Sequence, residues 1–212
     1  MAPDLPDDLT AAKLPDDAPA DGSLHVALAF ADLDLSGSEA AGVEVDQCSF
    51  RSVDLSGTKM RRWLIRDARL ERCDLANVQA RESDLSRVAI ASSRMTGLSW
   101  LDGGLRDVMF ADCRLDLASF RSSRFSDVVF SGCRLSQAEF GEADLSGARF
   151  EDCDLTGAQF SGARMTGTRL VGCDLTGIDG VTSLRGAIIT SGDARALAAT
   201  LAAALGITIR DE

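Results

Sequence analysis

The stretch ADLSGARFEDCDLTGAQFSG, residues 143–162, decides the fold, because it repeats a pattern every five residues. It divides into four units, and each unit has a large apolar residue at its centre: Leu145, Phe150, Leu155 and Phe160. A small residue, Ala or Cys, lies two places before each centre. The remaining three places carry mostly charged residues, small polar residues and Gly.

The same spacing extends over most of the chain. All nine Phe fall at positions divisible by five, and all six Cys lie two residues before such a position. Within the repeated region, eleven Gly lie two residues after one. The register is unbroken from about Leu28 to Gly177, which is about 70% of the chain. A period of five matches neither the 3.6 residues of an α-helix nor the two of a flat β-strand, so another backbone path is needed.

A square coil satisfies this period. If each unit forms a short extended side followed by a corner, four units close one coil and every side chain recurs 20 residues later. The central residue and the small residue two places before it then point inward, and the other three face solvent. Stacked coils lie about 4.8 Å apart, the spacing of β-strands. The predicted core includes Phe110, Phe120, Phe130, Phe140, Phe150, Phe160, Leu115, Leu135, Leu155, Leu175, Cys113, Cys133, Cys153 and Cys173.

Several units also resemble a known family. ADLSG (143–147), CDLTG (153–157 and 173–177) and VDLSG (53–57) are similar to pentapeptide-repeat proteins, whose pattern is A(D/N)LXX. The resemblance implies an all-β fold, a right-handed quadrilateral parallel β-helix. It also implies a class of function, because some members resemble B-DNA in size and charge, bind DNA gyrase, and inhibit it or protect it from quinolones.

The two ends depart from the repeat. Residues 1–27 contain all four Pro and six Asp against one Lys, which predicts a disordered acidic tail before a solenoid over residues 28–180. Residues 181–212 are expected to form a cap: a final coil, a capping α-helix over about 192–205 with Ser191 as its N-cap, and a short strand at 207–209. Leu197, Leu201 and Leu205 form one stripe of this helix. It either covers the chain's own last coil or, as the resemblance implies, joins two copies into a homodimer.

Composition argues against catalysis. Tyr is absent, and the one His, His25, is expected to be solvated at the end of the tail, so we expect no enzyme. We expect no cofactor and no metal. The Cys are interpreted as small buried apolar residues, and the alternative of a zinc site lacks His partners and any CxxC motif.

Charge and hydropathy limit the partners. The net charge of −11 disfavours direct nucleic-acid binding, which needs clustered basic residues. No apolar run approaches the roughly 18 residues of a membrane-spanning helix, and the acidic start does not resemble a secretory signal. We therefore expect no membrane contact and a cytoplasmic, reducing location, which also suits unpaired Cys.

Two outward columns are candidates for a partner surface. One is a ladder of charged residues spaced by 20: Asp34, Asp54, Asp74, Arg94, Arg114, Arg134, Asp154 and Asp174. The other is an apolar strip with Met109 and Val129 at its centre, beside Ala89, Ala91 and Ala111. The ladder is alternatively a solvated face on which neighbouring Asp and Arg pair.

One region breaks the pattern. Between Lys59 and Gly104, Trp63 occupies a place meant for a small residue, and Leu64 and Leu101 fall at outward places. We expect the coil to bulge or shift here, either as a packing adjustment or as a groove for a partner.

The sequence thus predicts a non-catalytic protein that presents a rigid face to a protein partner. DNA gyrase, bound by mimicry of DNA, is the partner that the resemblance implies, and a general protein interaction scaffold without a topoisomerase role is the alternative. The predicted rod of 7.5 coils is about 36 Å long, near one turn of duplex. DNA of that length carries about 21 negative charges, against a net −6 outside the tail.

Overall fold

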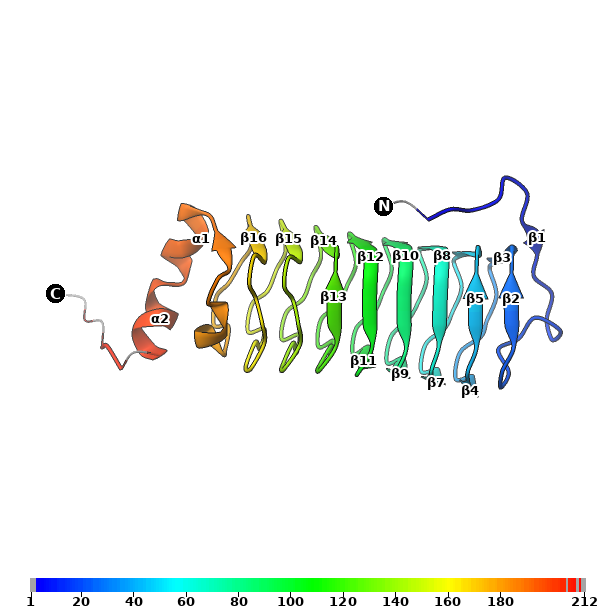
Figure 1. Cartoon of the computed structure of the whole chain (residues 1–212), viewed down its shortest axis with the longest axis horizontal. Helices are drawn as coiled ribbons and strands as arrows, with labels where there is room; N and C mark the ends of the chain where they lie inside the picture. Colours follow the sequence, from blue (N-terminus) through cyan, green and yellow to red (C-terminus); the bar gives the residue numbers. More distant parts are fainter. Residues whose placement is uncertain (1–2, 205, 209, 211–212) are drawn as a thin grey trace.

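The computed structural model describes residues 3–204, 206–208 and 210, which form a rod of stacked coils with helices at its C-terminal end (Figure 1). The strands are β1 (Thr10–Ala11), β2 (Leu24–Val26), β3 (Leu28–Ala31), β4 (Glu39–Ala41), β5 (Glu44–Asp46), β6 (Ser49–Arg51), β7 (Lys59–Arg61), β8 (Leu64–Glu71), β9 (Gln79–Arg81), β10 (Asp84–Ala91), β11 (Ser99–Leu101), β12 (Gly104–Ala111), β13 (Arg124–Ser126), β14 (Val129–Ser131), β15 (Arg149–Glu151), β16 (Arg169–Val171) and β17 (Ile188–Ile189). The helices are the 3-10 helix η1 (Val181–Leu184), α1 (Ser191–Ala196) and α2 (Ala198–Ala204).

The rod has four faces, each a parallel column that recurs every 20 residues. The β3 face contains β1, β3, β6, the second halves of β8, β10 and β12, and then β14, β15, β16 and β17. The β5 face contains β2, β5, the first halves of β8, β10 and β12, and β13. The β7 face contains β4, β7, β9 and β11. The fourth, the ladder face, is joined by isolated bridges from Asp34 to Asp174. The predicted parallel β-helix is therefore confirmed.

The corners follow the five-residue period. Every fifth residue from Gly22 to Gly177 has a positive φ, between 44° and 76°. Gly adopts this conformation without cost, and Asp and Asn tolerate it better than bulkier residues. Gly, Asp and Asn hold most of the corner places, and bulkier residues such as Arg62, Arg87 and Leu117 hold some of the others.

Side chains from the four faces fill one continuous apolar core. On the β3 face, the ring of Phe130 stacks on Phe110 at 4.7 Å and on Phe150 at 4.9 Å, measured between ring centroids. From the β7 face, Phe120 and Phe140 meet the same ring edge to face. The fourteen predicted core residues are all between 0% and 6% exposed.

The expected bulge between Lys59 and Gly104 is not present. Asp84 pairs with Leu64 in one neighbouring coil and with Gly104 in the other, so the 20-residue register continues unchanged. Inside the rod, the indole of Trp100 donates to the carbonyl of Ser83 at 3.1 Å and lies against Gly103. A Cβ at Gly103 would lie 2.7 Å from Trp100 Nε1 and would also collide with the Ser83 carbonyl. The missing side chain at Gly103 therefore accommodates a bulky ring without a shift of the backbone.

The solenoid starts earlier than the predicted Leu28. Strand β2 already pairs with β5 in the 20-residue register, with His25 opposite Val45, and β1 pairs with β3. The polar His25 occupies a central inward place and is 5% exposed, so the expectation that it is solvated is wrong. The sequence pattern did not identify His25 as a core residue, because every central residue from Phe30 onward is apolar and His25 is polar. Among the described residues of the predicted disordered tail over 1–27, β1 pairs with β3, Gly22 N–H donates to the Ala41 carbonyl and Asp4 contacts Asp67, so this part is ordered against the rod; residues 1 and 2 lie outside the described residues.

The C-terminal cap also differs in detail. The last coil is one residue short, because β17 pairs Ile188 with Arg169, after η1 replaces a side of the square. Thr190, and not Ser191, caps α1, and its hydroxyl and the carboxylate of Asp193 form a reciprocal capping box. The predicted helix is split into α1 and α2 at Leu197. Ile207 and Thr208 are not in a strand, and Ile209 lies outside the described residues. No helix among the described residues is both long and apolar enough to cross a membrane.

The stacked rings predict a strong dependence of stability on Phe130. Phe130→Ala should lower the free energy of unfolding by about 3–5 kcal/mol, because it removes a buried ring and leaves a cavity. The outward Arg114→Ala should change it by less than about 0.5 kcal/mol. Urea denaturation of both variants measures the difference, and equal losses would contradict a core built on these stacks.

Candidate functional site

The predicted charged ladder is a physical column. Consecutive members, from Asp34 to Asp174, are joined by parallel bridges across seven successive steps. Their side chains point away from the core. The structure therefore brings together on one face all eight ladder residues that the sequence places 20 apart.

The Asp residues of the ladder also stabilise the backbone. In five of the units, the Asp Oδ1 accepts a hydrogen bond from the backbone N–H two residues later, at 2.8–3.0 Å; these Asp are Asp34, Asp54, Asp74, Asp154 and Asp174. Hydrogen bonds from the hydroxyl and backbone of Ser36 lower the pKa of Asp34, and those of Thr176 lower the pKa of Asp174. This turn-forming role adds a local reason, beside the five-residue period, for Asp before the central Leu of these units.

Arg residues in the middle of the ladder pair with nearby carboxylates. Arg94 Nη1 lies 2.9 Å from Asp74 Oδ2, and Arg134 Nη2 lies 3.5 Å from Asp116 Oδ1. These Arg side chains remain more than half exposed, so each pair contributes little to stability. The ladder is therefore a surface of alternating charge blocks, acidic at both ends and basic at its centre.

The apolar strip on the β3 face is only partly available. Met109 is 48% exposed, but Val129 is only 6% exposed, so Val129 does not present the contact surface that its outward place suggests. On the sheet, Val129 is flanked by Met109 in one neighbouring strand and Arg149 in the other. A short side chain between two long ones can be covered by them, which the position alone does not reveal.

The N-terminal segment lies on the same face. Figure 1 shows the chain leaving β1 and running back along the rod toward β8. The backbone N–H of Asp4 donates to Asp67 Oδ1 at 3.1 Å, and Gln47 Nε2 donates to the Asp4 carbonyl at 3.4 Å. A groove of about 600 Å³ lies between this segment and strands β3, β6 and β8. The sequence gives no sign of this contact, because a Pro-rich acidic segment carries no periodic signal.

Asp67 is the buried anchor of this contact. It occupies the corner between the β5 and β3 faces, and its side chain is 7% exposed. Arg87, one coil further, holds both carboxylate oxygens, with Nε 2.7 Å from Oδ1 and Nη2 on Oδ2. These hydrogen bonds lower the pKa of Asp67.

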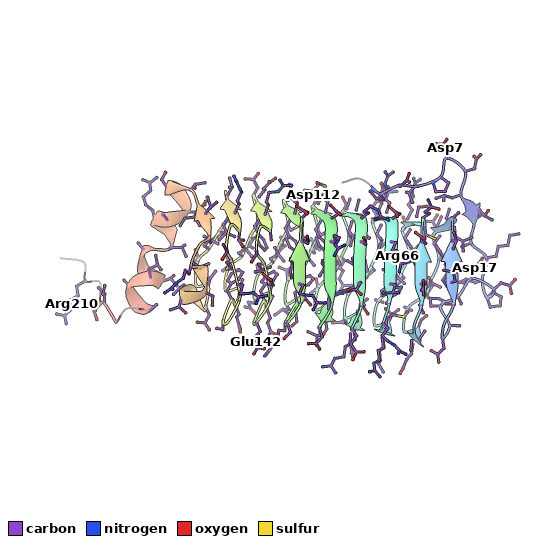
Figure 2. All side chains as sticks on the ribbon, viewed as in Figure 1. Asp7, Asp17, Arg66, Asp112, Glu142 and Arg210 are labelled. Atoms are coloured by element: carbon purple, nitrogen blue, oxygen red, sulfur yellow. The ribbon has the colours of Figure 1, made fainter. Side chains whose placement is uncertain are left out.

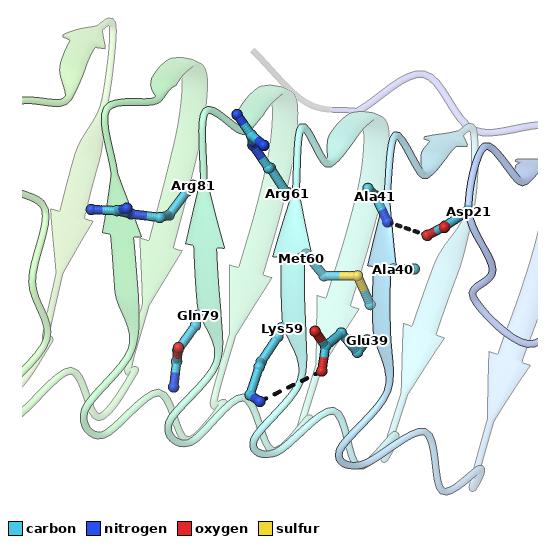
Figure 3. Close-up of a pocket in the computed structure, with 9 residues that line it drawn as sticks. All are labelled: Asp21, Glu39, Ala40, Ala41, Lys59, Met60, Arg61, Gln79 and Arg81. Atoms are coloured by element: carbon cyan, nitrogen blue, oxygen red, sulfur yellow. Dashed lines mark hydrogen bonds and ion pairs between the residues drawn. The ribbon is translucent and has the colours of Figure 1, made fainter.

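A second groove, of about 470 Å³, lies on the β7 face (Figure 3). Its charged side chains are engaged with one another: Lys59 Nζ lies 3.5 Å from Glu39 Oε2, and Arg61 pairs with Glu82 at 3.2 Å. The lining is of mixed charge, with Arg81 beyond these pairs, so the groove shows no preference for one charge of ligand. Along the rest of the rod, charged side chains such as Arg66, Asp112 and Glu142 project outward in the same way (Figure 2).

The interior offers His and Cys side chains, but in inert surroundings. The ring of His25 lies 5.9 Å from Phe30, its Nε2 is 3.0 Å from Ser23 Oγ, and burial lowers its pKa. The six Cys are free and buried, and burial raises the pKa of Cys48 and Cys73. Thiols along the column donate to backbone carbonyls, as Cys153 does to Phe130 at 3.5 Å. In the part of the chain that the structure describes, no three His, Cys, Asp or Glu side chains are grouped to hold a metal ion.

The three leucines of the predicted C-terminal stripe have different surroundings. Leu197 is buried, at 1% exposed, whereas Leu201 is 39% exposed. Leu205 lies outside the described residues. The stripe thus both covers the last coil and leaves an apolar side chain at the end of the rod.

A comparison with protein-family models also finds the five-residue repeat. Residues 103–179 match the family model described as "Pentapeptide repeat region". No curated protein sequence matches the chain.

Solved structures with a similar course include two repeat proteins. HetL, a pentapeptide repeat protein involved in heterocyst differentiation regulation from the cyanobacterium Nostoc sp. strain PCC 7120, is 21% identical; the match covers 81% of this chain and 91% of HetL, with a TM-score of 0.48. QnrB1, a plasmid-mediated fluoroquinolone resistance protein, is 23% identical; the match covers 89% of this chain and all of QnrB1, with a TM-score of 0.40.

The Asp67–Arg87 pair predicts a pH dependence of stability. Because folding lowers the pKa of Asp67, its ion pair stabilises the folded state above the unfolded pKa of about 3.9 and is lost as the pH falls through the lower folded value. The free energy of unfolding of wild type should exceed that of Asp67→Asn most at neutral pH. The difference should shrink as the pH falls from neutral to below the unfolded pKa of about 3.9 and through the lower folded value. Urea denaturation between these limits measures it, and a difference independent of pH would contradict the ion pair.

Proposed function

We propose that this chain, which is a pentapeptide-repeat protein, is a non-catalytic binding protein that presents one solenoid face to a protein partner. The observation that carries the proposal is the fixed geometry of its surface. Outward side chains are held in straight columns by a hydrogen-bonded backbone over a filled core. Such a surface is ordered before it binds, so little conformational entropy is lost on association.

The ladder face is the proposed contact surface. It combines two acidic blocks with a basic centre at Arg94, Arg114 and Arg134, a pattern that can align a partner of complementary charge. The non-catalytic part of the proposal is supported by the acid–base inventory. The one His and the six thiols are buried among core residues, where a substrate does not reach them.

DNA gyrase is the partner that we propose to test first, because the length of the rod is similar to that of a turn of duplex DNA. Ten strands of the β3 face make nine steps, a rod of about 43 Å, which exceeds one turn of duplex DNA. Duplex of that length carries about 25 negative charges. The ladder face replaces part of this charge by its three Arg, so mimicry by this face is incomplete and can be increased by substitution.

We place this function in the cytoplasm and propose a homodimer joined at the C-terminal ends. The six free thiols suit a reducing compartment. Leu201, Ile188 and Ile207 are 39–56% exposed near the same end of the rod, and a second copy would cover them.

Charge reversal on the ladder separates the two kinds of partner. The triple variant Arg94→Asp, Arg114→Asp, Arg134→Asp makes the ladder acidic throughout. If gyrase binds the rod as a DNA mimic, supercoiling should be inhibited at a concentration lower by roughly tenfold than for wild type, because more phosphate-like charge faces the enzyme. A partner that reads the basic centre should instead bind roughly tenfold more weakly.

The matched control changes three charges on another face: Arg61→Asp, Arg81→Asp, Arg121→Asp. It should leave both readouts unchanged. Absence of inhibition and of quinolone protection by wild type at micromolar concentration removes gyrase as the partner. If a cellular protein binds the ladder variant as well as wild type but does not bind the control variant, the contact surface is the β7 face instead.

The dimer has its own test. Multi-angle light scattering should give twice the chain mass for wild type and the single-chain mass for Leu201→Glu, because a carboxylate would be buried between the two ends. Thr200→Glu, one residue away on α2, is the control and should remain dimeric. A concentration-independent wild-type monomer would refute the role of this end.

A further inference from the structure

The N-terminal segment over residues 3–9, here called the strap, has an amphipathic arrangement. Its sequence PDLPDDL contains two Pro, which favour an extended backbone. Its apolar residues, Pro3, Leu5, Pro6 and Leu9, are half-buried, and its three Asp are exposed. The strap therefore lies with one side against the rod and an acidic side toward solvent.

The floor beneath the strap suits such a peptide. Outward side chains on β3 and β6 are small at Ala29, Ala31 and Ser49, which leaves a trough for Leu and Pro. On the rod side, the exposed Arg51 on β6 and Arg69 on β8 and the half-buried Glu71 on β8 line the same groove, so its wall is net positive beside the acidic strap. Apolar contact along the trough and positive charge at its wall are complementary to the two sides of the strap.

The strap is held loosely. Among the described residues, two hydrogen bonds join it to the rod, from Asp4 to Asp67 and from Gln47 to Asp4. The groove of about 600 Å³ remains between its side chains and the sheet. Farther along the β3 face, the outward residues of β10 are the small Ala89 and Ala91, and Met109 on β12 is 48% exposed. The strap thus leaves part of the groove unfilled.

We propose that the groove on the β3 face over β3, β6 and β8 is a docking site for an extended, acidic, proline-containing segment of a partner protein, which must displace the strap. The strap is then a built-in competitor of the same chemistry. The inference rests on the proposed binding function but adds a second face and the kind of segment that it accepts. An intramolecular competitor lowers the apparent affinity by the fraction of molecules in which the groove is open.

Peptide binding to the full chain tests this. The probe is a fluorescein-labelled synthetic peptide with the sequence of residues 1–9, and binding is followed by fluorescence anisotropy. The full-length variant Leu5→Ser, Leu9→Ser weakens the apolar side of the strap and should bind the peptide at least roughly tenfold more tightly than wild type. A peptide with its three Asp replaced by Asn should bind more weakly than the acidic one.

Two charge-reversal variants, one inside the groove and one outside it, test the role of the groove's positive charge. Added to the strap variant, Arg69→Glu should weaken peptide binding several-fold. Arg169→Glu, at the same register position on the same face but five coils away, should not. Circular dichroism of each variant checks that the solenoid is intact.

Three outcomes would overturn the proposal: equal affinity of wild type and strap variant, no binding by the strap variant up to millimolar peptide, or equal effects of the two Arg substitutions. None of these depends on gyrase or on the ladder face. Failure here leaves the proposed function standing, and failure of the ladder tests leaves this groove untouched.

Discussion

The rod depends on a corner that the backbone makes at each fifth residue. From Gly22 to Gly177 these corners all lie in the left-handed region, which costs an ordinary residue about 1–2 kcal/mol. The cost is offset because the corner sends two of every five side chains inward and aligns each with its counterpart 20 residues away. Hydrogen bonds between coils, such as Leu135 N–H to the Asp154 carbonyl at 2.7 Å, then satisfy the backbone.

This arrangement separates the residues that hold the fold from those that meet other molecules. Inward places carry Phe, Leu, Met, Ile and Cys, and outward places can vary in charge without disturbing them. The separation is not complete, because ladder carboxylates such as Asp154 also accept a backbone hydrogen bond at the following turn. A substitution on this face therefore has to be judged for the turn as well as for the partner.

The repeating part of the fold follows directly from the sequence, because Phe at every multiple of five is decisive evidence for one backbone path. The sequence fails where a contact is not periodic. His25 is buried although its type is polar, Val129 is buried although it stands at an outward place, and the strap contacts Asp67 from 63 residues away. The expected bulge near Trp63 is absent, and Gly103 makes room inside the rod for the ring of Trp100. These outcomes depend on neighbours across coils, which a single pattern does not encode.

The ring of Trp100 against Gly103 also bears on how such a chain can change in length. Between Phe110 and Phe160, successive coils contain nearly interchangeable contents, so one could be duplicated or removed while each ring still meets a ring. The segment from Trp63 to Gly103 does not tolerate such a change. The ring of Trp63 lies 6.1 Å from that of Trp100, and Trp100 lies against Gly103, so these residues of different coils fit together only in their present order. A coil can therefore be duplicated or deleted in the C-terminal half of the solenoid, but not between Trp63 and Gly103.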